Sequence, residues 1–332
     1  MEGKFQGQKA FRRKVLQMNE EVKMMKGANH FQLVSRSEKP TIAVISNLLA
    51  EKMAVDAMLE NKTTFVRLKS EGESHVYTIG NIGPHKIIST KLPMIGSDLQ
   101  AKISAGGTTT RLLGAFQEIQ HVFMVGVGGS VPHVYEFDKH SRLGDIVVTA
   151  PIAELPPSPQ GAPVGPGPGG QPHRHMYVFC EKVVYPDEFQ PPDTPIKFNL
   201  KKYAPPDNTL QKCVEKVLDG YERAPDDCQW QHYIEEGQKY FKGHGKDFTR
   251  PAPETDRLKV KIGEGCAFEI KHPEVPQDLE YLYRPGIPAV RLGVIGSGHS
   301  VTSEDALRDS FAMENHLLSY DAEYDQVLES II

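Results

Sequence analysis

Two clusters of glycine follow apolar stretches of the chain and could bring a ligand close to the backbone. The first is Gly126-Val-Gly128-Gly129-Ser130-Val-Pro132, and the second is Gly293-Val-Ile-Gly296-Ser297-Gly298-His299. A loop without bulky side chains lets a ligand approach the backbone N–H groups. Neither cluster has the G-x-G-x-x-G spacing of a dinucleotide-binding turn. Taken alone, each cluster fits a tight turn as well as a ligand cradle.

Other residues that could carry chemistry are sparse. Residues 173–175 (His-Arg-His) have no acidic or cysteine partner nearby, so we predict no metal site. No two cysteines are in C-x-x-C spacing, so neither a zinc knuckle nor a disulfide framework is expected. The chain lacks the G-x-S-x-G elbow of serine hydrolases and the P-loop motif. Glu254 and Asp256 flank Thr255 in a Pro-rich loop, and we expect both to be solvated.

An alternation of strand-like and helix-like segments must position the two glycine clusters. Strands are predicted at 41–46, 121–127, 146–149, 176–184, 289–295 and 317–320, with three more between 64 and 91. Helices are predicted at 49–60, 101–118, 208–221, 229–242, 303–314 and from 323 onward, with Thr302 or Ser303 capping the fifth. This order, with 121–127 as a central strand, predicts an α/β fold with a largely parallel sheet covered by helices on both faces.

The first 40 residues differ from the rest of the chain. They are predicted to form a basic amphipathic helical lead, because the apolar residues within 1–27 recur every three or four positions: Phe11, Val15, Met18, Val22 and Met25. Such a helix either packs on its own domain or binds a partner or an acidic surface. The main domain is then expected over residues 41–332.

Residues 151–172 interrupt the alternating pattern. Eight of these 22 residues are proline and five are glycine, a composition that continues neither a helix nor a central strand. We predict a flexible insertion. A spacer is favoured over a ligand for a Pro-rich-peptide reader, because the stretch lacks a clear P-x-x-P with a flanking basic residue.

The composition excludes several classes of protein. The 332 residues are 39% hydrophobic and 24% charged, which is enough to bury a core. No apolar run is long enough for a membrane span, and no secretory signal is visible. The formal charge of −5 argues against a dedicated nucleic-acid binder. The four scattered cysteines fit a reducing compartment, so a cytoplasmic location is expected.

Several ordered motifs together resemble the nucleoside phosphorylase/nucleosidase superfamily, in the form found in eukaryotic signalling proteins. The motifs occupy residues 44–61, 76–83, 124–132 (MVGVGGSVP), 142–149 (RLGDIVVT), 248–258 and 291–323. The likeness spans roughly 41–332, leaving the insertion and part of 185–245 unmatched. It implies a three-layer α/β/α fold with a mixed central sheet, and cleavage of a nucleoside N-glycosidic bond.

The resemblance also implies which residues form the site. Glu51 matches the glutamate that positions or activates water, a role that suits a carboxylate. Glu323, in Asp321-Ala322-Glu323, matches the glutamate that binds ribose. The remaining substrate-binding residues implied by the matching loops are Ser104, Gly128, Gly129, Ser297 and Gly298. Ser104 is expected at the small-residue turn before the central helix, where an anion would bind.

The sequence departs from the family pattern at three places. Met124 replaces the arginine that neutralises phosphate in many phosphorylases, which favours hydrolysis unless Arg111 or Arg142 substitutes. Ala322 replaces the methionine that packs on the sugar. The leaving-group aspartate and its strand have no counterpart before Ile332, so the C-terminal strand is expected to be missing.

The sequence therefore predicts hydrolysis of a purine-type nucleoside in nucleoside metabolism. The alternative is a non-catalytic nucleoside-binding or interaction module of a larger protein. No cofactor and no metal are expected, and phosphate is the co-substrate if the reaction is phosphorolysis. We expect a homo-oligomer that binds a small-molecule nucleoside, without a membrane or nucleic-acid partner.

Overall fold

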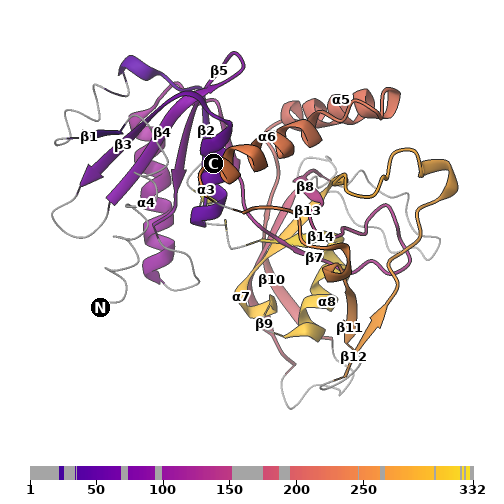
Figure 1. Cartoon of the computed structure of the whole chain (residues 1–332). Helices are drawn as coiled ribbons and strands as arrows, with labels where there is room; N and C mark the ends of the chain where they lie inside the picture. Colours follow the sequence, from indigo (N-terminus) through magenta and orange to yellow (C-terminus); the bar gives the residue numbers. More distant parts are fainter. Residues whose placement is uncertain are drawn as a thin grey trace. The chain divides into compact units, whose positions relative to one another are not determined.

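The structure is a computed structural model that describes most of the 332 residues. The described residues are 22–25, 34, 36–68, 74–93, 99–151, 175–186, 195–245, 247–261, 266–302, 304–321, 324 and 327–329. The 151–172 insertion, beyond its first residue, lies outside them, as do Ala322 and Glu323. The chain is an α/β protein that divides into two compact units (Figure 1). The boundary predicted at residue 40 stays a prediction.

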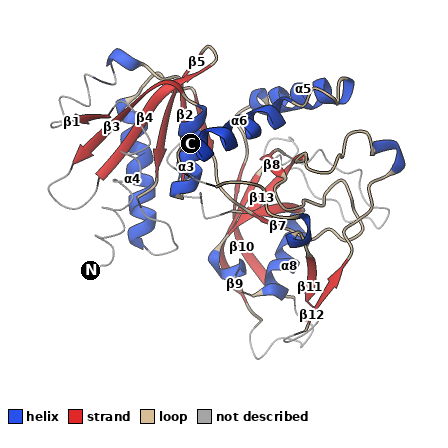
Figure 2. Cartoon of the chain, viewed as in Figure 1, coloured by secondary structure: helices blue, strands red, loops and turns tan. Residues whose placement is uncertain are grey.

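The first unit contains residues 1–127, 233–249 and 322–332, and its strands form a mixed six-stranded sheet in the order β1-β3-β4-β5-β2-β6. The strands are β1 (Val22–Met25), β2 (Ile42–Ser46), β3 (Glu60–Leu68), β4 (Ser74–Ile82), β5 (His85–Lys91) and β6 (His121–Met124). Strand β2 is parallel to both of its neighbours, β5 and β6. Figure 2 shows this sheet with helices α3 (Leu49–Met58) and α4 (Leu99–Ala115).

The core of the first unit explains its strand and helix pattern. Ala43, Val44 and Ile45 are buried in β2, so this strand reads as a continuous apolar run, as expected between two parallel neighbours. Val55 of α3 and Ile87 of β5 pack in one cluster with Val44. Helix α3 thereby returns onto the strand that it follows, which places its first turn at the carboxyl end of β2.

The second unit contains residues 128–232 and 250–321, with a sheet in the order β10-β9-β13-β14-β7 and β8 also pairing with β13. These strands are β7 (Gly129–Ser130), β8 (Ile146–Thr149), β9 (Tyr177–Val184), β10 (Lys197–Tyr203), β13 (Val290–Ser297) and β14 (Leu317–Tyr320). A separate hairpin consists of β11 (Leu258–Lys261) and β12 (Ala267–Ile270). Val178, Val294, Phe311 and Leu317 form the centre of the core.

Most predicted elements are confirmed. Besides the strands above, helices α5 (Thr209–Arg223), α6 (Gln229–Gly243) and α8 (Asp305–Asn315) lie within a few residues of their predicted bounds. Of the predicted last helix, the described residues 327–329 are helical. The sequence predicted one mixed central sheet, whereas the described strands form two mixed six-stranded sheets and a hairpin.

Three local predictions are wrong. Val22–Met25 is a strand rather than part of a helix, because it pairs with β3 in parallel register; the rest of 1–27 lies outside the described residues. Residues 121–127 were expected as a central strand, but β6 ends at Met124 and stands last in the described sheet. Thr302 does not cap α8, because it belongs to the short helix α7 (His299–Thr302) and the N-cap is Glu304.

Candidate functional site

Glu51 sits where the first unit changes from strand to helix. It is the third residue of α3, and its Oε2 accepts hydrogen bonds from the backbone N–H groups of Asn47 (2.9 Å) and Leu48 (2.7 Å). These donors precede the helix and have no helical partner, so the carboxylate satisfies them and also suits the positive end of the helix dipole. The same bonds hold the carboxylate, which is only 7% exposed, at the carboxyl end of β2.

The other carboxylate oxygen of Glu51 holds the chain that leaves β6. Oε1 accepts the backbone N–H of Val127 at 2.9 Å. A Cβ at Gly126 would lie 2.7 Å from the Tyr324 hydroxyl and 3.3 Å from Glu51 Oε1, so any larger residue would have to displace the Tyr324 side chain. Tyr324 in turn donates to the carbonyl oxygen of Val125 at 3.3 Å. The first glycine of the 126–132 cluster therefore serves the close approach of Glu51 and Tyr324 to the backbone.

Further polar groups gather at the same sheet edge. Ser46, the last residue of β2, is fully buried, and its hydroxyl has no hydrogen-bond partner among the residues that the structure describes. Lys91 ends the neighbouring parallel strand β5; burial lowers the pKa of its amine, and the charge of Glu51 opposes that shift. Ligands of open α/β sheets bind beyond the carboxyl ends of parallel strands. The site in the first unit therefore has a carboxylate, an amine and an unsatisfied hydroxyl at one edge.

In the second unit, strand β14 brings the two glycine clusters together. Tyr320 pairs with Gly296 of β13 on one side and with Gly129 of β7 on the other. The two clusters, about 165 positions apart in the sequence, therefore lie at the same end of the sheet with one strand between them. We call this end of the sheet the glycine edge. Ser297 follows Gly296 and is fully buried.

The glycines at this end of the sheet differ in what surrounds them. A Cβ at Gly128 would lie 2.7 Å from the backbone oxygen of Tyr320. Gly298 has φ +133°, and its Cβ would lie 2.6 Å from the carbonyl oxygen of Cys180. Both are thus explained by packing inside the protein. Gly129, in contrast, is exposed and a Cβ there would have nothing within 4 Å, so it is the position that a ligand can approach.

Asp321 lies at this edge and received no role from the sequence. Its Oδ1 accepts the Tyr177 hydroxyl at 2.8 Å, and its backbone N–H donates to the Gly296 carbonyl at 3.1 Å. The only sequence signal for it was its position two residues before Glu323. Glu323 itself lies outside the described residues. Ser104 is not at a turn before the helix, because α4 begins five residues earlier at Leu99.

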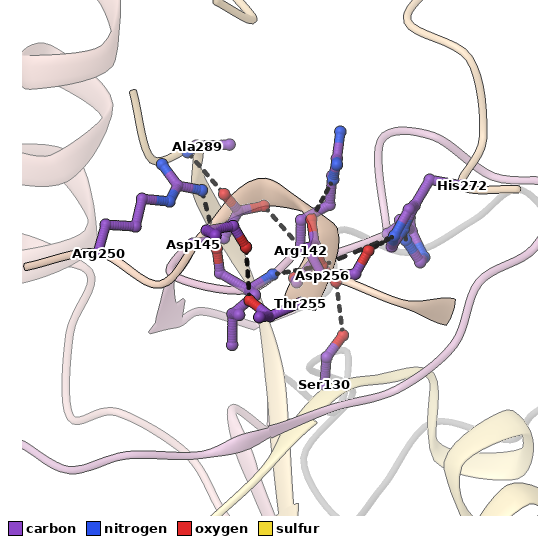
Figure 3. Close-up of polar contacts among 12 residues, drawn as sticks. Ser130, Arg142, Asp145, Arg250, Thr255, Asp256, His272 and Ala289 are labelled. Atoms are coloured by element: carbon purple, nitrogen blue, oxygen red, sulfur yellow. Dashed lines mark hydrogen bonds and ion pairs between the residues drawn. The ribbon is translucent and has the colours of Figure 1, made fainter. Parts of the chain in front are cut away.

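The turn at residues 142–145 (RLGD) is held by side chains from far along the chain (Figure 3). Arg142 Nε donates to Asp256 Oδ2 at 2.8 Å, and the backbone N–H of Leu143 donates to Asp256 Oδ1 at 3.2 Å. Burial raises the pKa of Asp256, but these hydrogen bonds and the Arg142 charge outweigh it and lower the pKa overall. The expectation of a solvated Asp256 is wrong, since its side chain is 14% exposed. Arg250 Nη2 also donates to the Leu143 carbonyl at 2.9 Å.

A second set of bonds fixes the same turn from its other side. Asp145 accepts the backbone N–H of Arg142 through Oδ2 and that of Ala289 through Oδ1, each at 2.9 Å (Figure 3). The Ala289 bond ties the turn to the residue before β13. Arg142 is thereby committed to the turn through both its backbone and its guanidinium, and Arg111 is exposed on α4. These contacts give no support to Arg111 or Arg142 as a substitute for the phosphate-binding arginine that Met124 replaces.

The described part of the chain offers no metal site, since no group of three or more His, Cys, Asp or Glu in it could hold a metal ion. All four cysteines are free thiols. Among the described residues, no helix is both long and apolar enough to cross a membrane.

No protein family profile matches the chain. It is 31% identical over 117 residues to a nucleotide-binding leucine-rich repeat (NLR)-like protein of Hyaloscypha variabilis. That match covers 35% of this chain, and the chain spans about a tenth (11%) of the relative's length.

Solved structures with a related arrangement were also found. A 5'-methylthioadenosine/S-adenosylhomocysteine nucleosidase of Neisseria meningitidis matches 88% of this chain and 79% of its own, with 14% identity and a TM-score of 0.42. A nucleosidase of Borrelia burgdorferi bound to adenine matches 87% and 79%, with 15% identity and a TM-score of 0.41. A futalosine hydrolase mutant of Helicobacter pylori matches 87% and 80%, with 12% identity and a TM-score of 0.38.

Proposed function

We propose that the chain is a nucleoside-binding module of the nucleoside phosphorylase/nucleosidase type and that it hydrolyses the N-glycosidic bond of a purine-type nucleoside. The observation that carries the proposal is Glu51, a buried carboxylate fixed at the carboxyl end of β2 by three backbone N–H groups. The ordered motifs around it, from residues 44–61 to 291–323, are the sequence support.

The hydrogen bonds of Glu51 suit the activation of water. An ionised carboxylate offers about four acceptor positions. Three are used by the N–H groups of Asn47, Leu48 and Val127, which leaves one for a water molecule. A carboxylate held in this way would orient the water and accept its proton as the glycosidic bond breaks. Since the transition state is oxocarbenium-like, a neighbouring negative charge also stabilises it.

Within the second unit, Gly129 and Ser297 are proposed as substrate-binding residues, because their loops match those that approach the nucleoside in the family. Gly129 of β7 is open to a ligand; β14, which ends just before Asp321, pairs with β7, and β13, which carries Ser297, pairs with β14. Glu323 is proposed to accept hydrogen bonds from the ribose hydroxyls, as its match to the family implies. No cofactor is required for this reaction.

A second candidate function is nucleoside sensing without catalysis, within a larger protein. Two observations favour it. The chain spans about a tenth of an NLR-like relative. The three backbone bonds of Glu51 also stabilise the fold by themselves, so that this residue has a structural role even without a reaction.

The test is release of free base from adenosine, guanosine, inosine and methylthioadenosine, measured by liquid chromatography, together with nucleoside binding measured by calorimetry. We expect release by the wild type and a loss of ~10²–10⁴-fold in kcat in Glu51→Gln, the usual contribution of a general base. Glu118→Gln, which alters an exposed glutamate of the same unit, should keep the wild-type rate.

The outcomes separate the two candidates. Nucleoside binding without base release would contradict hydrolysis and support sensing. Absence of both binding and release would overturn the nucleoside assignment altogether. A Glu51→Gln variant that melts like the wild type and turns over at the wild-type rate would remove Glu51 from the reaction.

A further inference from the structure

A pocket on the second unit is lined by none of the residues of the glycine edge or of the 142–145 turn. It has a volume of about 560 Å³ and lies between two segments, residues 134–138 and the stretch with Pro273, Glu274, Pro276 and Leu279. Its walls combine two aromatic rings and two prolines with carboxylates. None of the functions proposed above uses it.

The first wall of the pocket is rigid. The Phe137 ring packs edge-on against Tyr283, with ring centroids 4.6 Å apart. The buried guanidinium of Arg291 stacks over Phe137 and donates to the backbone oxygen of Asp138 at 2.7 Å. At the start of the segment, the His133 ring bonds the Leu317 carbonyl of β14 at 2.9 Å. These contacts anchor the segment on both sides of the pocket, so the pocket exists before any partner binds.

Tyr135 projects from this rigid wall into solvent and is 95% exposed. A tyrosine ring gains free energy when it is buried, so covering Tyr135 would stabilise a contact with a partner. Tyrosine is also among the residues that dominate protein interfaces, because it buries a large area with few rotatable bonds. Tyr135 is thus the natural anchor of a contact at this pocket.

The charge of the pocket indicates the chemistry of its partner. Glu136, Asp138 and Glu274 line it, and its lining contains no lysine, arginine or histidine. Glu136 is paired with Lys139 at 2.6 Å, but Asp138 and Glu274 form no ion pair with any other described residue. Two carboxylates beside an exposed aromatic ring match a guanidinium, which pairs with carboxylates and stacks on aromatic faces.

We infer that this pocket is a docking site for an arginine-bearing segment of a partner protein, with Tyr135 stacking on the guanidinium and Asp138 and Glu274 receiving its charge. The inference is independent of the proposed nucleoside chemistry, because it uses none of the same residues.

The test is fluorescence anisotropy of the full chain with a labelled Gly/Ser-spaced peptide that carries arginines. The same peptide with glutamates in their place, and an uncharged proline-rich peptide, are the comparison probes. We expect the arginine peptide to bind best and to lose affinity as salt rises. Tyr135→Ala and the pair Asp138→Asn with Glu274→Gln should each weaken binding about tenfold or more.

Matched controls come from the same surface. Tyr281→Ala removes another exposed tyrosine, and Asp278→Asn removes another exposed carboxylate, yet neither residue lines the pocket. Both should bind the peptide as the wild type does. Because Tyr135 is exposed, Tyr135→Ala should also keep the wild-type melting temperature, which excludes unfolding as the cause of a loss.

Three results would overturn the inference. The first is no binding of the arginine peptide by the wild type. The second is equal binding of the arginine, glutamate and proline-rich peptides, or tighter binding of the proline-rich one. The third is a Tyr135→Ala variant that binds as tightly as Tyr281→Ala.

Discussion

His140 and His272 show how hydrogen bonds fix the protonation of a buried residue. His140 Nε2 lies 2.9 Å from His272 Nδ1, and His272 Nε2 lies 3.1 Å from the backbone oxygen of Asp256. That oxygen only accepts, so His272 Nε2 carries the proton and His272 Nδ1 must accept from His140. His140 Nδ1 then has no proton and no partner among the described residues. In this arrangement the His140 ring is neutral and donates through Nε2.

The pair predicts a stability that falls in mild acid. Burial, followed by the charges of His272, Arg291, His133 and Arg142, lowers the pKa of His140 from 6.5 to about 4. Between those values the unfolded chain binds a proton that the folded chain does not, so the free energy of unfolding decreases as the pH falls from 6.5 to 4. The slope from this residue is at most about 1.4 kcal/mol per pH unit.

Denaturant unfolding across this pH range measures the effect. His140→Gln, which cannot titrate, should show a shallower slope than the wild type. His85→Gln, at an exposed histidine, should keep the wild-type slope. Equal slopes in all three proteins would mean that His140 does not control the acid response.

At the scale of elements, α3 is attached to its sheet by a buried polar cluster. Lys52 is fully buried, and its amine donates to Asp56 at 2.8 and 2.9 Å, to Thr78 Oγ1 at 3.0 Å and to Ser89 Oγ at 3.2 Å. Thr78 also donates to Asp56 at 3.0 Å. Burial lowers the pKa of Lys52, while Asp56 opposes that shift. The cluster ties the helix that carries Glu51 to strands β4 and β5.

Breaking this cluster from one side should destabilise the protein strongly. Lys52→Met leaves the buried Asp56 without its cation, which typically costs ~3–5 kcal/mol. Replacing both partners, as in Lys52→Met with Asp56→Leu, removes the buried charge as well and should recover most of that loss. Urea unfolding of the two variants measures the difference. A double variant no more stable than Lys52→Met alone would contradict this account.

At the scale of the whole chain, the candidate residues are divided between the two units. Glu51 belongs to the first unit, and the glycine edge with Gly129, Ser297 and Asp321 belongs to the second. Neither set contains a guanidinium placed for phosphate: Met124 ends β6, and Arg142 is bonded to Asp256. On the proposed function, we therefore expect water rather than phosphate to be the second substrate.

The corresponding prediction, which rests on the proposed function, is that base release does not depend on phosphate. The release assay is run in a phosphate-free buffer and repeated with phosphate added. Equal rates, with free ribose as the sugar product, are expected. A strict requirement for phosphate, with ribose 1-phosphate as the product, would show that another cation serves and that hydrolysis is the wrong reaction.

The order of strands and helices could be read from the sequence because it depends on local pattern. The strand predicted at 41–46 and the helix predicted at 49–60 are present in the structure as β2 and α3. The first glycine cluster does follow a strand, β6, whereas residues 293–297 of the second cluster lie inside β13. Glu51 could be selected because its motif lies at one strand-to-helix junction, where a carboxylate has a local structural reason to be.

Contacts between distant segments could not be read in this way. The order of strands in a sheet depends on pairing partners far along the chain. That order decides that β6 stands last in the described sheet and that Val22–Met25 is a strand. Nothing in the sequence indicated that Lys52 would be buried, as it is in the structure. Asp256 was expected to be a solvated loop acid, but it pairs with Arg142, which is 114 positions away in the chain. The physical reason is that burial and ion pairing are properties of the assembled structure. They depend on which distant groups pack around a side chain and exclude water from it. Local periodicity carries no information about those distant groups.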